Sequence, residues 1–277
     1  MPTWLITGCS TGLGQQLARA VLERGWNAVV TARDVRSVQS LAQTYPNTAL
    51  PLALDVTDHA RVADVVGQAE ARFGHIDVLV NNAGHGYRAA VEEADDADVG
   101  ELFATNFFGP VAMTKAVLPG MRARRRGTIV NVSSIAARGS HPGSGYYSAT
   151  KFALEGMSDA LRKEIGPLGI KVLVVEPGAF RTDFAGRSLQ QSATVIADYD
   201  DTAGRRRKQN DETHGHQPGD PARGAQAIIV AAESDSPPFR LLLGSDAIGY
   251  VRAELGAQVQ ELEAWAALSL TTDFPPA

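Results

Sequence analysis

The 277-residue sequence contains a single cysteine, Cys9, and has no excess of basic residues. One thiol cannot form a disulfide within the chain or, by itself, a thiolate metal site, which is in keeping with a reducing compartment. The 26 Lys and Arg residues are outnumbered by 31 Asp and Glu residues, so the chain lacks the positive charge that attracts nucleic acid. We therefore expect no nucleic-acid partner, and we interpret Cys9 as a small residue in a tight loop rather than a nucleophile.

Long apolar runs are absent too. No stretch approaches the roughly 20 apolar residues that a membrane-spanning helix needs, and the first residues enter a strand-like segment without the basic and apolar regions of a secretory signal. These patterns predict no membrane span and a cytoplasmic location. Hydrophobic residues make up 44% of the chain and charged residues 21%, a balance typical of a globular protein with a sizeable core.

Short apolar segments alternate along the chain with longer stretches of helical periodicity. This alternation predicts an α/β fold, in which a doubly wound, mostly parallel, seven-stranded Rossmann-type sheet carries helices on both faces within a single domain, 1–277. The predicted strands are Trp4 to Thr7, Ala28 to Thr31, Ala49 to Leu54, Val78 to Val80, Thr128 to Val132, Lys171 to Val175 and Arg240 to Leu243.

The domain divides into regions of different expected roles. We assign residues 1–95 mainly to cofactor binding and residues 96–182 to catalysis. Residues 183–220 are polar and lose the alternation, which indicates a mobile substrate loop, and residues 245–268 are predicted to form a terminal helix.

Within the predicted loop, Arg205, Arg206, Arg207 and Lys208 form a basic run. A solvated loop face is the favoured interpretation, and an interaction patch is the alternative. His214 and His216 have no further ligand-type residues nearby in the sequence, so we expect no metal site.

A glycine-rich turn follows the first predicted strand and opens the first helix. Glycines permit a tight turn and close approach of the backbone to a pyrophosphate, while the free N–H groups and the helix dipole stabilise the anion. The spacing departs from G-x-G-x-x-G, and a purely structural turn is the alternative. The candidate cofactor-binding residues of the turn are Gly8, Ser10, Thr11, Gly12, Leu13 and Gly14.

The end of the second strand favours NADP(H) over NAD(H). Folds that prefer NAD(H) place an acidic residue there to bond the ribose 2′-hydroxyl, but this strand ends at Arg33, which suits a 2′-phosphate with the Ser10 hydroxyl opposite. Asp34 follows directly and is left with two alternatives, bonding a ribose or capping the next helix. Asp55, with Val56 after it, closes the third strand where a carboxylate reaches an adenine amine.

At Tyr147 to Lys151 the sequence Tyr-Ser-Ala-Thr-Lys, together with the glycine turn and Asn81 to Gly84, resembles the short-chain dehydrogenase/reductase family. The resemblance extends from Thr3 to about Phe184, and it is greatest to the branch of 17β-hydroxysteroid and retinol dehydrogenases. It implies a lipophilic alcohol or carbonyl substrate and assembly as a homodimer or homotetramer.

Tyr147 and Lys151 are four residues apart and therefore share one face of a helix. A free phenol has a pKa of about 10, and a nearby ammonium is expected to lower it. The resemblance implies that Lys151 also bonds the nicotinamide ribose. Tyr146 competes with Tyr147 for the catalytic role, but five residues separate it from Lys151, which is a poorer angular match.

The resemblance implies further site residues. Ser134, 13 residues before Tyr147, would orient the substrate oxygen, with Ser133 as the competing candidate because neighbours on a strand point to opposite sides. Asn106 would support a proton relay to Lys151, or act as a structural asparagine that kinks its helix. The remaining cofactor-binding residues are Asn82, Ala83 and Gly84 after the fourth strand, and Pro177, Gly178 and Thr182 after the sixth.

These patterns predict an NADP(H)-dependent oxidoreductase that interconverts a small-molecule carbonyl and an alcohol by general acid catalysis, without a metal. The alternatives are a non-catalytic NADP(H)-binding sensor, which would typically lack the tyrosine or the lysine, and a sugar-nucleotide epimerase, which needs a larger C-terminal region.

Substrate contacts are expected from His85 to Tyr87, from Arg138 to Tyr146 and from the segment after Thr182, all at the carboxyl ends of strands. A further group of side chains suggests either an apolar pocket or the packing of a lid. Its members are Tyr87, Ile135, Tyr146, Phe180 and Phe184.

Overall fold

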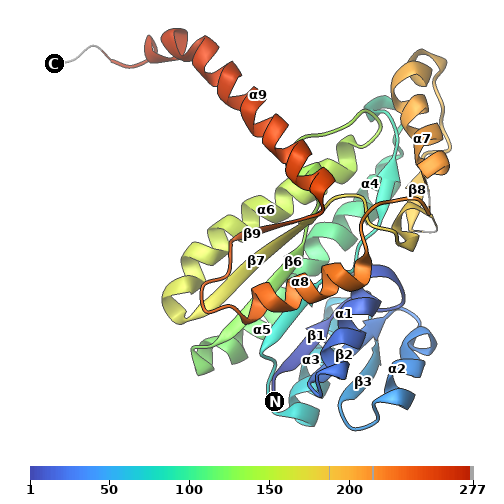
Figure 1. The fold of residues 1–277 in the computed structure, drawn as a ribbon, viewed down its shortest axis with the longest axis vertical. Coiled ribbons are helices and arrows are strands. Elements are labelled where there is room, and N and C mark those ends of the chain that lie inside the picture. The colour runs from blue at the N-terminus through green and yellow to red at the C-terminus, as the bar shows by residue number, and fades with distance from the viewer. Residues whose placement is uncertain (187, 214, 275–277) are drawn as a thin grey trace.

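A seven-stranded parallel sheet forms the centre of the computed structural model, which describes residues 1–186, 188–213 and 215–274 (Figure 1). Its strand order is β3-β2-β1-β4-β6-β7-β9, so the winding reverses between β1 and β4, where such sheets open a ligand crevice at the carboxyl ends of the strands. The predicted seven-stranded fold is confirmed. The strands are β1 (Thr3–Ile6), β2 (Asn27–Ala32), β3 (Ala49–Ala53), β4 (Val78–Asn81), β6 (Gly127–Val132), β7 (Ile170–Pro177) and β9 (Arg240–Leu243).

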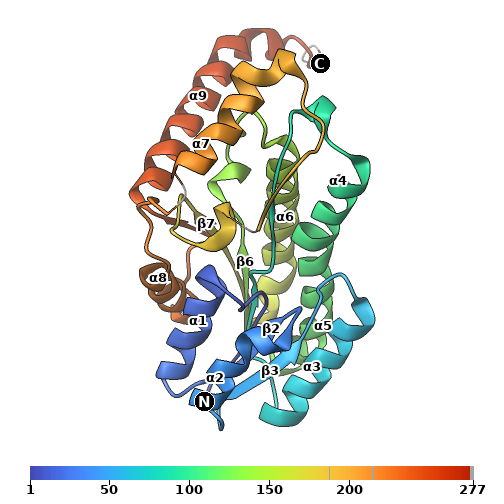
Figure 2. The same cartoon turned by 90° about the vertical axis from the view of Figure 1, so that its right-hand side faces the viewer.

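Helices cover both faces of the sheet, which appears nearly edge-on between them in Figure 2. One core cluster joins the sheet to α1, α2 and α8, and the other joins it to α3, α5 and α6. The helices are α1 (Gly12–Glu23), α2 (Gln39–Thr44), α3 (His59–Phe73), α4 (Asp96–Phe103), α5 (Gly109–Arg124), α6 (Gly145–Ile165), α7 (Arg205–Thr213), α8 (Pro221–Glu233) and α9 (Ser245–Leu270).

The two cores follow from the alternation of side chains along each strand. Trp4 and Ile6 of β1 lie in the cluster with α1 and α8, whereas Leu5 between them lies in the cluster with α3 and α5. Val29 and Val30 of β2 divide in the same way. Because a strand buried on both faces needs apolar residues at successive positions, these segments show continuous apolar runs.

A second, two-stranded parallel sheet was not predicted. It pairs β5 (Gly86–Arg88) with β8 (Leu189–Gln191), so it ties the loop after β4 to the segment predicted as a substrate loop. Gly86 permits this pairing, because a side chain there would begin 2.6 Å from Cδ1 of Leu189.

Residues of the predicted loop 183–220 form β8, α7 and several short helical turns, so the segment contains regular elements. Buried Glu93 holds it to the domain: its carboxylate accepts a hydrogen bond from Ile196 N at 2.9 Å and pairs with Arg207 of α7. The hydroxyl of Tyr199 donates to Glu92 at 2.6 Å. The mobility of this segment stays a prediction.

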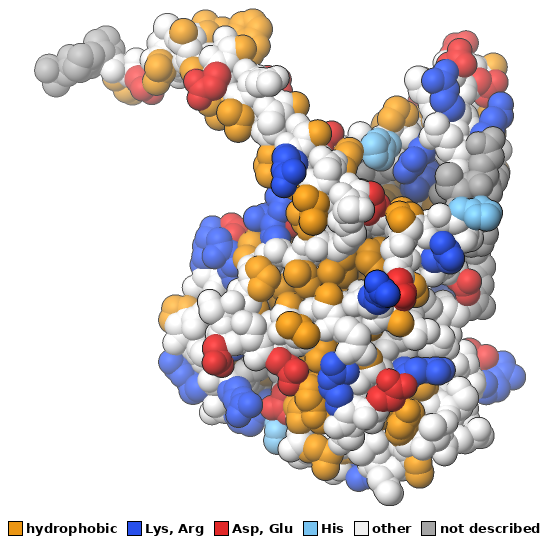
Figure 3. Space-filling view, viewed as in Figure 1, with side chains coloured by type: hydrophobic (Ala, Val, Ile, Leu, Met, Phe, Trp, Pro, Cys, Tyr) orange, Lys and Arg blue, Asp and Glu red, His pale blue; other side chains and the backbone are white. Residues whose placement is uncertain are grey.

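The terminal helix α9 leaves the body of the domain and projects beyond it (Figure 1). It occupies the range predicted for the terminal helix and ends two residues later. Hydrophobic side chains lie exposed along it (Figure 3), among them Val259, Leu262, Trp265 and Leu268. No helix of the described residues has the length and apolar character needed to cross a membrane.

Candidate active site

A cavity of about 1030 Å³ opens at the carboxyl ends of the strands. Nearly all the site residues predicted from the sequence line it, and Gly14 and Asn106 are the two exceptions. The predicted residues that line it are Gly8, Ser10, Thr11, Gly12, Leu13, Arg33, Asp55, Val56, Asn82, Ala83, Gly84, Ser134, Tyr147, Lys151, Pro177, Gly178 and Thr182.

The glycine turn needs its glycines for different reasons. Gly8 and Gly12 have φ values of 71° and 61°, in the left-handed region that side chains disfavour. Gly14 does not line the cavity, and a Cβ atom there would lie 2.3 Å from Nδ2 of Asn82 and 2.4 Å from the carbonyl oxygen of Gly8. Gly14 therefore serves the close packing of helix, turn and β4 rather than direct contact with a ligand.

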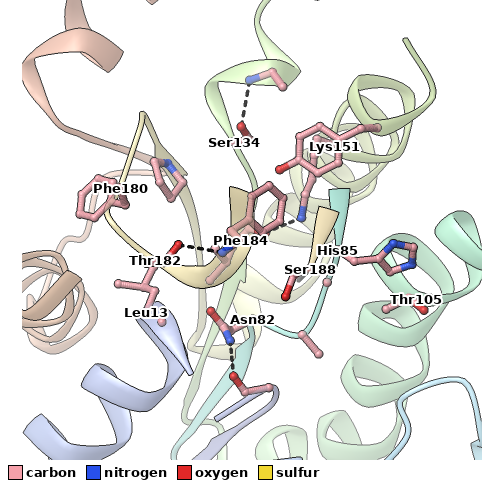
Figure 4. Close-up of a pocket in the computed structure, with 18 of the residues that line it drawn as sticks. Leu13, Asn82, His85, Thr105, Ser134, Lys151, Phe180, Thr182, Phe184 and Ser188 are labelled. Carbon is pink, nitrogen blue, oxygen red and sulfur yellow. Dashed lines mark hydrogen bonds between the residues drawn. The ribbon is translucent and has the colours of Figure 1, made fainter. Parts of the chain in front are cut away.

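Asn82 ties the glycine turn to β4. Its Nδ2 donates to the carbonyl oxygens of Thr7 at 2.8 Å and Gly8 at 3.0 Å (Figure 4). The hydroxyl of Thr7, which the sequence analysis did not single out, accepts from the backbone N of Asn82 and of Ala83, each at 2.9 Å. Cys9 in the same turn is buried, and burial raises its pKa to about 12, so this thiol is not a nucleophile.

The two alternatives for Asp34 are resolved in favour of capping. Its carboxylate accepts from the backbone N of Arg36 at 3.0 Å and pairs with the Arg36 guanidinium at 2.8 Å, and it does not line the cavity. Arg36 also lowers the pKa of Asp34. Arg33 lines the cavity and forms no ion pair with any described residue, so a cation without a carboxylate partner stands at the end of β2.

The competing serines and tyrosines are separated by their partners. Both serines line the cavity, but the Ser133 hydroxyl is engaged by Glu155, to which it donates at 3.0 Å. Ser134 Oγ accepts from Ala136 N at 3.1 Å (Figure 4) and is the serine that forms a hydrogen bond with Tyr147. Tyr147 is only 7% exposed and lines the cavity, while Tyr146 does not line it and donates to the carbonyl oxygen of Val91 at 3.2 Å.

Burial governs the electrostatics of Tyr147 and Lys151. Burial raises the pKa of Tyr147, and a hydrogen bond with Ser134 and the charge of Arg88 oppose that rise. Burial lowers the pKa of Lys151 to about 8, and its Nζ donates to the carbonyl oxygen of Val132 at 3.0 Å, 5.8 Å from the centre of the Tyr147 ring. The net direction for Tyr147 is a rise, whereas a nearby ammonium was expected to lower the pKa, because burial outweighs the hydrogen bond with Ser134 and the charge of Arg88.

Asn106 lies in a π-helical turn, Ala104–Phe108, between α4 and α5. Its Oδ1 accepts from His85 N at 3.0 Å, and its Nδ2 donates to the carbonyl oxygen of His85 at 2.9 Å and to Thr150 Oγ1 at 3.3 Å. The wider turn is the local distortion expected at a functional position. Asn106 thus fixes the backbone after β4 against the helix that carries Lys151, and its role in a proton relay stays a prediction.

Thr182 lies over the glycine turn, because a Cβ atom on Gly12 would be 3.2 Å from the Thr182 Cβ. Its Oγ1 accepts from Phe184 N at 3.3 Å (Figure 4). The ring centre of Phe184 lies 5.7 Å from that of Tyr147. The segment after β7 therefore covers both the glycine turn and the Tyr147 side of the cavity.

The predicted substrate contacts are only partly present. His85, Ile135, Phe180 and Phe184 line the cavity, and so do His141 and Ser144 from the range 138–146. Gly86, Tyr87 and Tyr146 do not line the cavity, so these three residues pack against the surrounding structure and are not substrate contacts.

Arg138 forms an ion pair with Glu176 at 2.8 Å and also stays outside the cavity. Of the two histidines of the predicted loop, His216 lines the cavity and His214 lies outside the described residues.

Several cavity residues were not named from the sequence, among them Arg88, Glu101 and Asp246. Arg88 follows the predicted contacts by one residue. Arg206 lies in the segment after Thr182, where substrate contacts were expected, but its basic run was interpreted as a solvated face, and it lines the cavity. Neither arginine has a motif that identifies it from the sequence, since their placement depends on the pairing of β5 with β8 and on the folding of α7 over the site.

Residues 2–193 match the family described as short chain dehydrogenase. The chain is 37% identical over 270 residues to Oxidoreductase BOA17 of Botryotinia fuckeliana, which covers 97% of this chain and 98% of that protein. It is 39% identical over 243 residues to a 3-ketodihydrosphingosine reductase of Bacteroides thetaiotaomicron, covering 87% of each.

Solved structures share the whole fold. A short-chain dehydrogenase from Streptomyces avermitilis superposes with a TM-score of 0.93 at 41% identity, covering 98% of each chain. The structure titled ElxO with NADP bound superposes with a TM-score of 0.74 at 26% identity, covering 90% of this chain and 99% of that one.

Proposed function

The chain belongs to the short-chain dehydrogenase family, and from this premise we propose that it is an NADP(H)-dependent oxidoreductase that interconverts a ketone or aldehyde and an alcohol. Family membership supports oxidoreductase activity with a nicotinamide cofactor. The observation that carries the proposed reaction is the convergence of Tyr147, Ser134 and Lys151 on one cavity wall.

The residues present fit a dinucleotide. The glycine turn leaves no room for side chains at Gly8 and Gly14, and its free N–H groups at the start of α1 suit a pyrophosphate. Asp55 and Val56 would hold the adenine end, and Thr182 the nicotinamide end. The nicotinamide cofactor, when bound, supplies or accepts the hydride.

Arg33 supports the choice of NADP(H). It lines the cavity where β2 ends, and the neighbouring Asp34 is engaged by Arg36 instead of facing a ribose. An unpaired guanidinium suits a 2′-phosphate, and the Ser10 hydroxyl lies on the same cavity. The solved structure of ElxO, which is similar to this chain, contains NADP.

The side chains of the site have distinct tasks in the proposed reaction. In reduction Tyr147 donates its phenolic proton to the carbonyl oxygen, and Ser134 donates a hydrogen bond to the same oxygen as negative charge develops on it. Because burial raises the pKa of Tyr147, the phenol keeps the proton that reduction consumes. Lys151 would bond the nicotinamide ribose and hold the cofactor next to the phenol. Oxidation of the alcohol reverses these transfers.

Apolar cavity residues support a substrate with a lipophilic body. Ile135, Phe180 and Phe184 line the wall beside Tyr147, which is in keeping with the proposed kinship to the 17β-hydroxysteroid and retinol dehydrogenase branch. The relatives compared above carry other names, so this branch rests on the sequence motifs.

We also propose a homodimer or homotetramer and a cytoplasmic location. The exposed apolar side chains of α9, with Leu262 63% and Trp265 61% exposed, support self-association, since apolar patches on a surface mark interfaces. The cytoplasmic location rests on the sequence, including its one free, buried thiol.

A non-catalytic NADP(H) sensor is the second candidate function. Such a protein need not keep a tyrosine and a lysine within one cavity, and here both line it together with Ser134. This favours catalysis.

The test is a screen of NADPH oxidation across aldehydes, ketones and quinones with wild type, Tyr147→Phe and Tyr146→Phe. Loss of the proton donor should reduce kcat by about 100-fold or more with NADPH binding retained. Tyr146→Phe is the matched control, since its hydroxyl bonds Val91 outside the cavity, and it should retain turnover. Retained turnover in Tyr147→Phe would refute the assignment, and binding without turnover of any carbonyl by wild type would favour the sensor.

A further inference from the structure

Besides Arg33, two arginine side chains face the cavity without a carboxylate partner among the described residues. Arg88 of β5 and Arg206 of α7 both line it, and neither forms an ion pair with any residue that the structure describes. Among the described residues the Nε atoms of both are buried and have no hydrogen-bond partner. Buried charged groups are normally paired, because an unpaired one loses its hydration without compensation.

Arg88 is the more deeply placed of the two, with 8% of its surface exposed. Its Nη1 donates a long hydrogen bond, 3.4 Å, to the carbonyl oxygen of Tyr87. Burial and the neighbouring Arg206 lower its pKa to about 10, so the guanidinium remains charged at neutral pH. Its charge also acts on the phenol of Tyr147, which places Arg88 beside the proposed reaction centre.

The folding of α7 separates three consecutive arginines. Arg207 pairs with buried Glu93 and anchors the helix to the domain. Arg205 faces solvent, with 66% of its side chain exposed and Asp201 3.7 Å away. Arg206 between them is turned to the cavity and forms no ion pair with a described residue. Its position is fixed, because the neighbouring Arg207 anchors the helix.

Positive charge dominates around this pair. Burial, Arg206 and Arg88 lower the pKa of His141, which also lines the cavity, and Glu254 opposes them. Among the described residues no carboxylate is among the charges that act on Arg88. Three acidic residues line the cavity: Asp55 is bonded to Thr57, Asp246 to Ala179 N, and Glu101 acts on His85. Because none of these carboxylates is among the charges that act on Arg88, an oxyanion that enters next to Tyr147 meets the guanidinium groups of Arg88 and Arg206.

We propose that Arg88 and Arg206 form a subsite for an oxyanion, so that the substrate is a carbonyl compound carrying a carboxylate or phosphate group, such as an oxo acid. The carbonyl half of this statement rests on the proposed function, and the oxyanion subsite rests on the two arginines alone. Guanidinium groups bind carboxylate and phosphate through paired, charge-assisted hydrogen bonds. The apolar wall of Phe180 and Phe184 would carry the body between carbonyl and anion.

The anion takes no part in the bond changes. In the reduction of an oxo acid to a hydroxy acid, the bound nicotinamide cofactor would supply the hydride for the carbonyl carbon and would be oxidised, Tyr147 supplies the proton for the oxygen, and the carboxylate stays ionised throughout. The subsite therefore acts by binding and orienting the substrate.

The test compares each acid with its neutral methyl ester as substrates for NADPH-dependent reduction. The probes are levulinate and 4-acetylbenzoate, each with its ester, and 4-acetylphenyl phosphate. We expect a higher kcat/KM for the anion than for the ester in wild type, and a fall in this ratio of about 10- to 100-fold in Arg206→Gln. Arg205→Gln, which removes the neighbouring exposed charge, is the matched control and should keep the wild-type ratio.

A binding assay separates the two hypotheses. With NADP⁺ present, 4-acetylbenzoate should raise the Tm of wild type and of Arg205→Gln but raise it less in Arg206→Gln and Arg88→Gln. This pattern without turnover would contradict the proposed function and leave the subsite standing. A preference for the phosphate over the carboxylate would support the subsite and assign it to phosphate esters.

Three results would overturn the subsite. One is an acid-to-ester ratio that Arg206→Gln leaves at the wild-type value. Another is the absence of both turnover and a Tm shift with all three anions. The third is a rise in the KM of NADPH in Arg206→Gln with an unchanged ratio, because the arginine would then serve the cofactor.

Discussion

Replacing Lys151 by methionine is expected to stabilise the fold while it removes activity. Lys151 is buried at the cavity wall, and its Nζ donates to the carbonyl oxygen of Val132 at 3.0 Å. Burial lowers its pKa from 10.5 to about 8. The unfolded chain therefore binds this proton more tightly than the folded chain does, so the charged ammonium opposes folding.

The size of the effect follows from the two pKa values. One pKa unit corresponds to about 1.4 kcal/mol, so at neutral pH the buried charge costs about 3 kcal/mol. The sign of the pH dependence follows from proton binding. The folded wild type loses the Lys151 proton at a lower pH than the unfolded chain does, so wild type regains stability as the pH rises from about 8 to 10.5. The methionine variant has no proton to lose at this position, so its stability does not gain in this way. Loss of the hydrogen bond to Val132 costs about 1 to 3 kcal/mol at every pH, so it does not affect the pH dependence.

The assay is urea unfolding of both proteins without cofactor at a series of pH values. The free energy of unfolding of Lys151→Met minus that of wild type should decrease by roughly 2 kcal/mol between pH 7 and pH 9.5. Lys163→Met is the control on the same helix, since its side chain is 61% exposed, and its difference from wild type should not change over this range. A constant difference for Lys151→Met would refute the argument from burial.

Other substitutions test the cofactor turn and the assembly. Arg33→Ala should raise the KM of NADPH by about 10-fold or more and change that of NADH much less, because only NADPH carries the 2′-phosphate; equal changes would contradict the cofactor assignment. Gly14→Ala should destabilise the fold by about 1 to 3 kcal/mol in thermal or urea unfolding, since its Cβ would lie 2.3 Å from Asn82 Nδ2; unchanged stability would show that the turn relaxes freely. Leu262→Glu on α9 should reduce the molar mass measured by light scattering if that helix joins subunits, and an unchanged oligomer would exclude this face.

The sheet was predictable because its strands are buried on both faces. Successive apolar residues such as Leu5 and Ile6 enter opposite cores, which leaves a local signal of uninterrupted apolar segments. The pair β5 and β8 was missed because each has three residues and its pairing depends on a partner about 100 residues away, a contact that no local pattern encodes.

The choice between neighbouring residues depended on the three-dimensional packing. Ser133 and Ser134 both line the cavity, but the Ser133 hydroxyl is engaged by Glu155, whereas Ser134 bonds Tyr147. Of the two neighbouring tyrosines Tyr147 lines the cavity and Tyr146 does not, since the Tyr146 hydroxyl bonds Val91. For Asp34 the ion pair with Arg36, two residues along the chain, decided between capping a helix and bonding a ribose. Helix capping was already one of the two alternatives predicted from the sequence.

By itself the sequence determined the fold class and the cofactor turn, and it narrowed the catalytic candidates, because these depend on periodicity and on residues close together in the chain. Only the tertiary structure decided the charge around Tyr147. Arg88 and Arg206 reach the cavity from β5 and α7, which long-range pairing and the Glu93–Arg207 contact hold over the site. Electrostatic influence depends on distance in space rather than along the chain, so the substrate end of this site could be interpreted only after the chain was folded.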